Sequence, residues 1–269
     1  MILTTPMRRF LPCLFAAWLA AGASVRAADV TAYTEESPPY HYLENGQVAG
    51  PAADLLRAAC ERAKLSCNIE LLPWARAMAL TKLKPNALLF SVVRTPEREA
   101  KFVWLGPVVT EPMWLFGRPD SPAVQSLAGL NQVRVGVVNG SAGADFLRAA
   151  GVPPQAIDAA NGSEANLRKF ALHRVDFIVS TDSRMQRQLK RQPLPFKVSK
   201  VLQLADATSY FAMHLQSSPE FVQALRTALE ELRNTKPYRD KLGRSEPSEK
   251  LSEPGAGCSS RCHNRAPAS

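Results

Sequence analysis

Arg98 is the residue whose type and setting most clearly suit binding chemistry. It closes the run Thr95-Pro96-Glu97-Arg98, in which Thr95 is placed to cap a helix that begins at Pro96. A guanidinium offers a planar fork of N–H donors that matches a carboxylate, so this arginine is suited to an anionic solute. Ser91, at the end of an apolar run, would add a hydroxyl. The alternative is an ordinary surface arginine in the first turn of a helix.

Two further arginines lie near this segment. Arg76 follows Pro73-Trp74-Ala75, and Arg94 comes just after the apolar run that ends near Ser91. If these two and Arg98 all faced one ligand, that ligand would be acidic, because desolvated cations require anionic partners. The alternative is that the arginines pair with acidic side chains of the chain itself, namely Glu35, Glu36 or Glu97.

Other candidate contacts come from three loops. Glu35 and Glu36 either hold a cationic group of a ligand or are solvated, whereas Tyr40 and Trp74 either stack on a ligand or are buried. Gly140-Ser141 leads from an apolar run directly into a helical pattern. Backbone N–H groups at such a helix start point toward an anion and are favoured by the helix dipole.

Hydrophobic periodicity predicts an α/β fold that positions these residues. Apolar runs and alternation predict strands at 29–34, 68–72, 87–92, 132–139, 175–180, 197–202 and 209–215. Helical spacing predicts helices at 52–64, 74–83, 142–149, 164–172, 182–191 and 219–233. Because strands and helices alternate, we expect a mostly parallel sheet covered by helices, and the restart of the pattern near 132 indicates a second lobe.

The first residues predict a secretory signal peptide. Arg8 and Arg9 precede an apolar run from 10 to 21, which is too short to span a bilayer. We expect cleavage after Ala27 and export to the periplasm; an uncleaved anchor helix is the alternative. The net charge of +9 would fall to +6, because the leader carries three arginines and no acid. The remaining basic residues are scattered, which argues against a nucleic-acid partner.

The chain has five cysteines, of which Cys13 lies in the leader. Cys60 and Cys67 lie near the end of a predicted helix and the start of the next strand, so they can face each other across the turn. The segment 244–269 is rich in Ser, Pro, Glu and Gly, and we expect it to be disordered. There, Cys258 and Cys262 with His263 make an incomplete metal-ligand set, so we expect neither a metal nor a cofactor.

The order of motifs resembles the family 3 periplasmic solute-binding proteins of amino-acid ABC transporters. The resemblance runs from about residue 30 to 243 through YTEESPPY, GQVAGPAADLL, SVVRTPEREAKFVWLGPVV, VRVGVVNGSAGADFL, VDFIVSTDS and YFAMHL. It implies a two-lobed type II periplasmic-binding-protein fold, with a hinge between the lobes and a mixed, mostly parallel sheet flanked by helices in each. Lobe one would comprise residues 28–115 plus 208–243 and lobe two residues 116–207, between the signal peptide 1–27 and the tail 244–269.

The resemblance also implies roles for single residues. Arg98 matches the arginine that clamps a ligand carboxylate, with Ser91 beside it. Ala142 stands where relatives often place a threonine that contacts the same carboxylate. Asp182 follows the strand after which relatives place an acceptor for the ligand ammonium, or it caps the next helix. Some relatives carry a disulfide at the spacing of Cys60 and Cys67, and in the oxidising periplasm we expect the same bond here.

These features predict a monomeric protein that captures a small polar, carboxylate-bearing solute, such as an amino acid, for the inner-membrane permease of an ABC importer. Two alternatives stay open. One is a ligand-sensing module that signals by the same hinge closure. The other is a periplasmic dehydratase of the cyclohexadienyl type, which needs an acid in the cleft, such as Glu35, Glu36 or Asp182. No Ser-His-Asp order, metal-ligand spacing or phosphate-loop pattern favours an enzyme.

Overall fold

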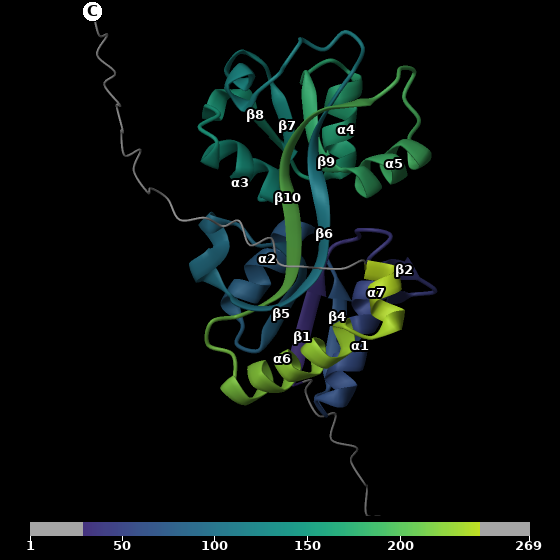
Figure 1. Ribbon diagram of the computed structural model, residues 1–269, viewed down its shortest axis with the longest axis vertical. Coiled ribbons are helices and arrows are strands. Elements are labelled where there is room, and N and C mark those ends of the chain that lie inside the picture. Colours follow the sequence, from purple (N-terminus) through teal and green to yellow (C-terminus); the bar gives the residue numbers. More distant parts are fainter. Residues whose placement is uncertain (1–28, 243–269) are drawn as a thin grey trace, which may run out of the picture.

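The computed structural model describes residues 29–242, which form two lobes, one above the other in Figure 1. The lower lobe holds β1 (Val30–Thr34), β2 (Tyr42–Glu44), β3 (Gln47–Ala49), α1 (Pro51–Arg62), β4 (Cys67–Leu71), α2 (Trp74–Leu83), β5 (Ala87–Val93), the 3-10 helix η1 (Pro96–Lys101), α6 (Pro219–Arg233) and α7 (Lys236–Leu242). The upper lobe holds η2 (Leu127–Gln132), β7 (Val135–Val138), α3 (Ala142–Ala149), η3 (Pro154–Ala156), β8 (Ile157–Ala160), α4 (Ser163–Ala171), β9 (Phe177–Thr181) and α5 (Asp182–Arg191). Two long strands, β6 (Val103–Gly117) and β10 (Ser199–Met213), run through both lobes.

One eight-stranded sheet continues through both lobes in the order β4-β1-β5-β10-β6-β9-β7-β8. The outer pairs are parallel, namely β4 with β1, β1 with β5, β9 with β7 and β7 with β8. The three pairs that involve β10 or β6 are antiparallel. The predicted α/β architecture of two lobes with mostly parallel strands and flanking helices is confirmed, and β6 and β10 are the strands that join the lobes.

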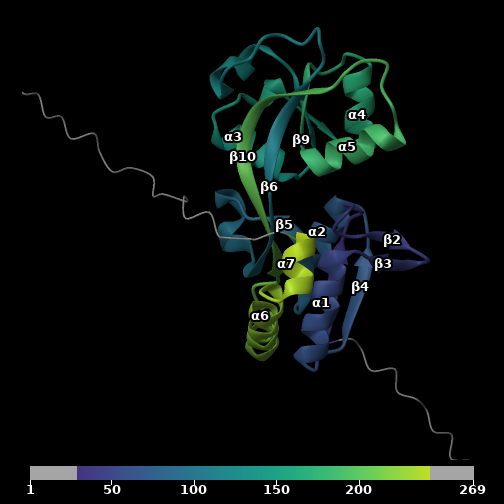
Figure 2. The same cartoon turned by 45° about the vertical axis from the view of Figure 1, so that its right-hand side comes forward.

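The core of the lower lobe follows from the helical spacing of α1. Leu55, Leu56 and Ala59 are fully buried against Phe90 of β5 and against the apolar face of α6. Each such leucine contributes about 2 kcal/mol by its removal from water. In Figure 2, α1, α6 and α7 lie together in the lower lobe. Pro51 starts α1 at a position where its missing N–H costs nothing.

The upper lobe has its own core on both faces of the sheet. One apolar cluster joins Val135 and Val137 of β7 to Leu147 of α3. A second joins Phe170 of α4 to Ile178 of β9. Because each lobe buries a separate apolar core, the two can act as units that move about the strands joining them.

Strand β6 was not predicted, because Gly106, Pro107 and Pro112 read locally as strand breakers. Both prolines lie between residues 103 and 112, where β6 pairs only with β10. Pairing with β9 starts at Met113. The prolines therefore lie where β6 is an edge strand, and there a missing N–H donor leaves no neighbouring carbonyl unpaired.

Other differences from the predicted elements also come from pairing. The extended segments predicted at 197–202 and 209–215 overlap the two ends of the single strand β10, because β6 pairs along its whole length. The short strand β8 and the hairpin of β2 with β3 were missed, since three or four residues carry too little periodicity. The predicted tail 244–269 and the signal peptide 1–27 lie outside the described residues.

Cys60 and Cys67 form a disulfide between α1 and β4, as expected. Their Cα atoms lie 6.1 Å apart across the turn that joins the two elements. The bond closes a loop of sequence separation 7, so it fixes the position of β4 at the edge of the sheet.

Replacement of both cysteines by alanine is expected to lower the free energy of unfolding by about 2–3 kcal/mol, because the unfolded chain regains the entropy of a short loop. Urea unfolding of the variant and of the original protein, each with and without reductant, measures this difference. Reductant should shift the unfolding midpoint of the original protein only. Equal midpoints for the two oxidised proteins would contradict the prediction.

Candidate functional site

A cavity lies between the two lobes, with walls from both. The lower lobe contributes Glu35, Tyr40, Trp74, Ser91 and Arg98, the upper lobe contributes the start of α3 and parts of β9 and α5, and β6 and β10 close it. Its volume of about 110 Å³ gives room for several water-sized groups, which suits a small solute. Of the residues predicted from the sequence to bind ligand, Glu35, Tyr40, Trp74, Ser91, Arg98 and Ser141 line this cavity.

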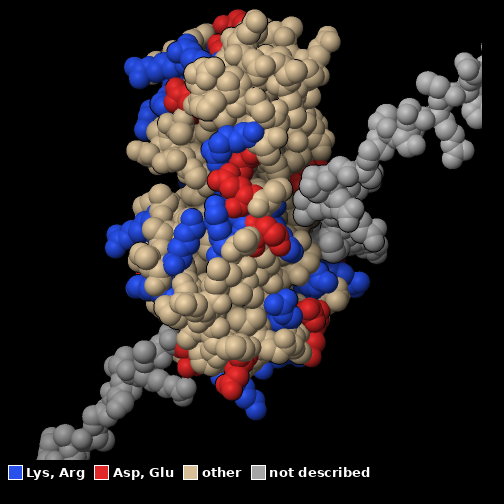
Figure 3. Space-filling model, turned by 90° about the vertical axis from the view of Figure 1, so that its left-hand side faces the viewer, with Lys and Arg blue, Asp and Glu red and all other residues tan. Residues whose placement is uncertain are grey.

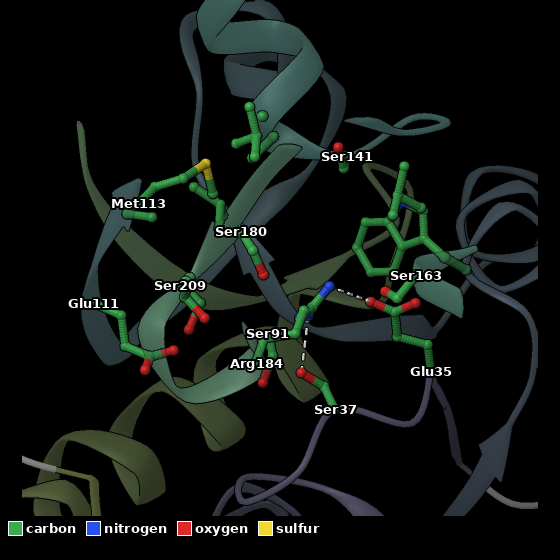
Figure 4. A pocket seen from close by; sticks show the side chains of 18 of the residues that line it. Glu35, Ser37, Ser91, Glu111, Met113, Ser141, Ser163, Ser180, Arg184 and Ser209 are labelled. Carbon is green, nitrogen blue, oxygen red and sulfur yellow. Dashed lines mark hydrogen bonds and ion pairs between the residues drawn. The ribbon is translucent and has the colours of Figure 1, made fainter. Parts of the chain in front are cut away.

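Two serine hydroxyls on the cavity wall stand out because no described residue bonds to them. Ser91 Oγ and Ser180 Oγ are buried and make no hydrogen bond within the described residues. Ser91 also adopts a left-handed backbone conformation, with φ of 59°, which is uncommon for a residue other than glycine and recurs at functional sites. Figure 4 shows Ser91 and Ser180 among the side chains of this pocket, with the Ser180 hydroxyl turned toward its middle. Buried hydroxyls without protein partners are available to a ligand.

Arg98 is buried and faces the other lobe. Its Nε lies 2.7 Å from Asp145 Oδ2 of α3, and its Nη2 donates to the carbonyl of Gly140 at 2.8 Å. Both charged side chains of this ion pair are only 6% exposed. Burial lowers the pKa of the Arg98 guanidinium and raises the pKa of the Asp145 carboxyl, and each partner's charge opposes that shift in the other. A carboxylate of the chain itself therefore occupies one edge of this guanidinium.

Other side chains around Arg98 also form hydrogen bonds between the two lobes. Thr95 Oγ1 donates to Asp145 Oδ2 at 3.3 Å, and Trp74 Nε1 donates to Gly140 O at 2.9 Å. Thr95 thus directs its hydroxyl to the other lobe. It makes no capping hydrogen bond to η1, a single 3-10 segment in place of the predicted helix.

Arg94 and Arg76 do not line the cavity. Arg94 Nε donates to Glu99 at 2.6 Å, and its guanidinium lies over the rings of Trp104 and Tyr210. This pairing raises the pKa of Arg94 above its ordinary value, chiefly through the hydrogen bond to Glu99. Arg76 is exposed on α2. The partners of Arg94 and Arg98 are Glu99 and Asp145, which differ from the acidic residues considered from the sequence.

Two other predicted positions have local partners. The Ser141 N–H donates to Val138 O at 3.0 Å within the turn, so it does not point at the cavity, and Gly140 presents its carbonyl to the other lobe. Asp182 is the first residue of α5 and lies outside the cavity wall; its carboxylate is 2.9 Å from Lys200 Nζ. It does not cap α5, because Thr181 holds the N-cap position and no side-chain cap bond forms there.

The acidic pair in the first loop also bridges the lobes. Glu35 lies 3.3 Å from Arg184 of α5, and the same arginine donates to Ser37 Oγ at 2.8 Å (Figure 4). Glu36 lies 2.8 Å from Arg191. On a different face, the left-hand side of Figure 1, acidic and basic side chains also intermingle at the level where the lobes meet (Figure 3). Glu35 and Glu36 therefore serve as partners of arginines across the cleft.

Sequence reasoning missed Asp145, Arg184 and Glu111 as residues of the site. Glu111 lies on β6 and lines the cavity next to Tyr40. Burial raises the pKa of the Tyr40 phenol, and the charge of Glu111 raises it further. Asp145 and Arg184 lie in amphipathic helices, where a charged residue normally reads as part of a solvated face. No local signal identified Glu111.

Within residues 29–242, no helix is long and apolar enough to cross a membrane. The same part of the chain contains no cluster of three or more His, Cys, Asp or Glu side chains that could hold a metal ion. The cysteines 258 and 262 and His263 lie outside the described residues.

The fold resembles that of several solved structures. A histidine kinase sensor domain with similarity to periplasmic binding proteins superposes with a TM-score of 0.70 at 19% identity, over 79% of this chain and 94% of that one. The arginine-, lysine-, histidine-binding protein ArtJ from Geobacillus stearothermophilus gives 0.66 at 18% identity, over 81% and 96%. AbpA, an amino acid ABC transporter substrate-binding protein from Streptococcus pneumoniae bound to L-arginine, gives 0.64 at 18%, over 80% and 92%.

Sequence comparison gives a family assignment. No curated protein matches the chain. The model for bacterial extracellular solute-binding proteins, family 3, matches residues 30–241, which is nearly the whole of the described fold. That match agrees with the two lobes, the shared strands β6 and β10 and the polar cavity between the lobes. The chain belongs to family 3 of the bacterial extracellular solute-binding proteins.

Proposed function

We propose that this protein is a periplasmic receptor that captures a small polar solute between its lobes and presents the closed form to the permease of an ABC importer in the inner membrane. Closure would move the lobes about β6 and β10, with lobe one comprising residues 28–115 and 208–243 and lobe two residues 116–207. The signal peptide at 1–27 would direct the protein to the periplasm, where it would act as a monomer and without a cofactor.

The cavity between the lobes is the observation that carries this proposal. Its wall combines side chains from both lobes, so a bound solute would contact both and stabilise the closed arrangement. Ser91 Oγ of the lower lobe and Ser180 Oγ of the upper lobe have no hydrogen-bond partner within residues 29–242, so a ligand could satisfy both. Such a site suits a small solute with several hydrogen-bonding groups.

The relatives suggest which solutes to test first. Two of the similar structures are an arginine-, lysine-, histidine-binding protein and a transporter protein bound to L-arginine. Amino acids and related amines are therefore the first candidates. The acids considered for a dehydratase, Glu35, Glu36 and Asp182, pair with Arg184, Arg191 and Lys200, so structural roles account for them.

A thermal-shift screen of the unfolded and refolded protein tests the proposal. A ligand at about 100 times its dissociation constant adds about 2.7 kcal/mol to stability. We expect a rise in melting temperature with one class of amino acids, amines, dicarboxylates or short peptides. Ser180→Ala should weaken binding of that compound about tenfold, because one buried hydrogen bond is lost.

Ser126→Ala is the matched control, because this exposed serine lies outside the cavity wall and makes no capping bond. It should leave the affinity unchanged. The absence of any shift across the whole panel, or equal affinity in Ser180→Ala, would contradict capture in this cavity.

A sensory role is the second candidate. It is favoured by the similarity in fold to a histidine kinase sensor domain and by the side-chain contacts that already join the lobes, such as Arg98 with Asp145. Uptake of the labelled solute by cells that lack the protein separates the two roles. Lost uptake supports import, whereas normal uptake with a lost transcriptional response supports sensing.

A further inference from the structure

The charged groups around the cavity are unevenly matched. Four ionisable side chains on its wall carry a formal charge at neutral pH, namely Glu35, Arg98, Glu111 and Arg184. Arg184 pairs with Glu35, and Arg98 pairs with Asp145 behind the wall. Within the described residues, Glu111 has no ion-pair partner. Both arginines are thus neutralised by carboxylates of the chain, and one carboxylate of the cavity remains without a counter-charge.

Glu111 is placed to receive a cationic group. It is half-buried on β6, opposite the small, buried Ala207 of β10, so the neighbouring strand leaves room beside it. The phenol of Tyr40 lies close to it, but a neutral group supplies no counter-charge. A partly desolvated carboxylate gains most from a charged partner with N–H donors, such as an amine or a guanidinium. In Figure 4, Glu111 lies on the side of the pocket away from Glu35.

The unpartnered hydroxyls point to the same kind of ligand. Ser180 is 8% exposed and lines the cavity with its Oγ unbonded, as does the Oγ of Ser91. Hydroxyl oxygens accept hydrogen bonds from ammonium and guanidinium N–H groups, which carry more donors than one carboxylate can satisfy. Asp145 in turn already supplies a carboxylate to Arg98 at 2.7 Å, which is the interaction that a ligand carboxylate would otherwise make.

We propose that the cavity selects a small organic cation whose charged group is held by Glu111, and that Asp145 takes the place of a ligand carboxylate at Arg98. This inference rests on the proposed capture of a solute between the lobes. It specifies the ligand class as amines or guanidines for which a carboxylate is not required. It also reverses the acidic ligand expected from the arginine content of the sequence.

Isothermal titration calorimetry of the refolded protein with matched compounds tests the proposal. Arginine and citrulline share one shape but differ in side-chain charge, whereas arginine and agmatine share the guanidinium but differ in the carboxylate. Lysine and cadaverine form the same contrast for an amine, and glutamate and succinate represent anions. We expect at least one cation to bind, its uncharged analogue to bind at least tenfold more weakly, and its decarboxylated form to bind within a few-fold.

Variants assign the effect to Glu111. Glu111→Gln keeps the size of the side chain and an acceptor oxygen and removes the charge, so it should weaken binding of the cation by about tenfold to a hundredfold. Glu99→Gln is the matched control, since Glu99 is exposed and pairs with Arg94 away from the cavity. It should leave the affinity unchanged. Equal melting temperatures of the unliganded variants would show that Glu111→Gln still folds.

The failures are distinguishable. Binding of an anion or of an uncharged compound in preference to every cation, or full affinity in Glu111→Gln, would overturn the inference but leave solute capture intact. Loss of binding when the carboxylate is removed would overturn the role given to Asp145. No binding of any compound would overturn both the inference and the proposed function.

Discussion

Asp145→Asn is expected to separate the two lobes. The variant leaves Arg98 buried without its counter-charge, and breaking one side of a buried ion pair costs about 3–5 kcal/mol. Because the pair joins two lobes, the arginine can regain water when the lobes open, without unfolding of either core. A shift of this size changes a closed-to-open equilibrium by more than a hundredfold.

Small-angle X-ray scattering measures this change as an increase in the radius of gyration of Asp145→Asn over that of the original protein. Glu97→Gln is the control, because its ion pair with Arg148 spans the same lobes but is exposed and worth less than about 1 kcal/mol. The double variant Arg98→Met with Asp145→Leu should return to the closed dimensions, since both buried charges are removed together. An unchanged radius of gyration in Asp145→Asn would show that this pair does not hold the lobes together.

Acidification is expected to destabilise the protein through His41. This residue is 1% exposed in the loop that follows β1; its Nδ1 donates to Glu35 O at 2.7 Å, and its Nε2 has no hydrogen-bond partner among the described residues. The pKa of His41 is lowered from 6.5 to about 4, chiefly by burial; the hydrogen bond to Glu35 opposes this shift, and the charge of Arg184 adds to it. The folded protein therefore keeps this imidazole neutral at a pH where the unfolded chain already binds a proton.

The direction of the effect follows from the lowered pKa. The contribution of neutral His41 is fully present above pH 6.5 and is lost as the pH falls from there through about 4. A difference of this size corresponds to about 3 kcal/mol of unfolding free energy. Urea unfolding at a series of pH values between 7 and 4 should show a loss of this order, in addition to that of other groups.

His41→Asn isolates this contribution, because an amide can still donate to Glu35 O but does not titrate in this range. The variant should lose about 3 kcal/mol less stability than the original protein between pH 7 and 4. Ser126→Ala, which replaces an exposed residue and removes no titratable group, is the control and should retain the original slope. Equal slopes for His41→Asn and the original protein would rule out His41 as the source.

Much of the fold could be predicted from the sequence, because helices and buried strands leave periodic patterns. The predicted helices at 74–83, 142–149 and 182–191 coincide with α2, α3 and α5. The cysteine spacing predicted the disulfide, since a seven-residue separation fits a single turn between a helix and a strand. The order of motifs identified the family for the same reason: each motif is a local segment, and local segments can be read one at a time.

The pairing of charges was decided only by the tertiary structure. Arg98 and Asp145 come from different lobes, as do Arg184 and Glu35, and helical or strand spacing contains no information about which side chains meet across a cleft. The long strand β6 also depends on its context, because its prolines are tolerated only where no second strand lies beside it. The sequence by itself determined most of the helices and buried strands and the family, whereas the juxtaposition of distant segments determined which charges of the cavity are already neutralised and left Glu111 without a counter-charge among the described residues.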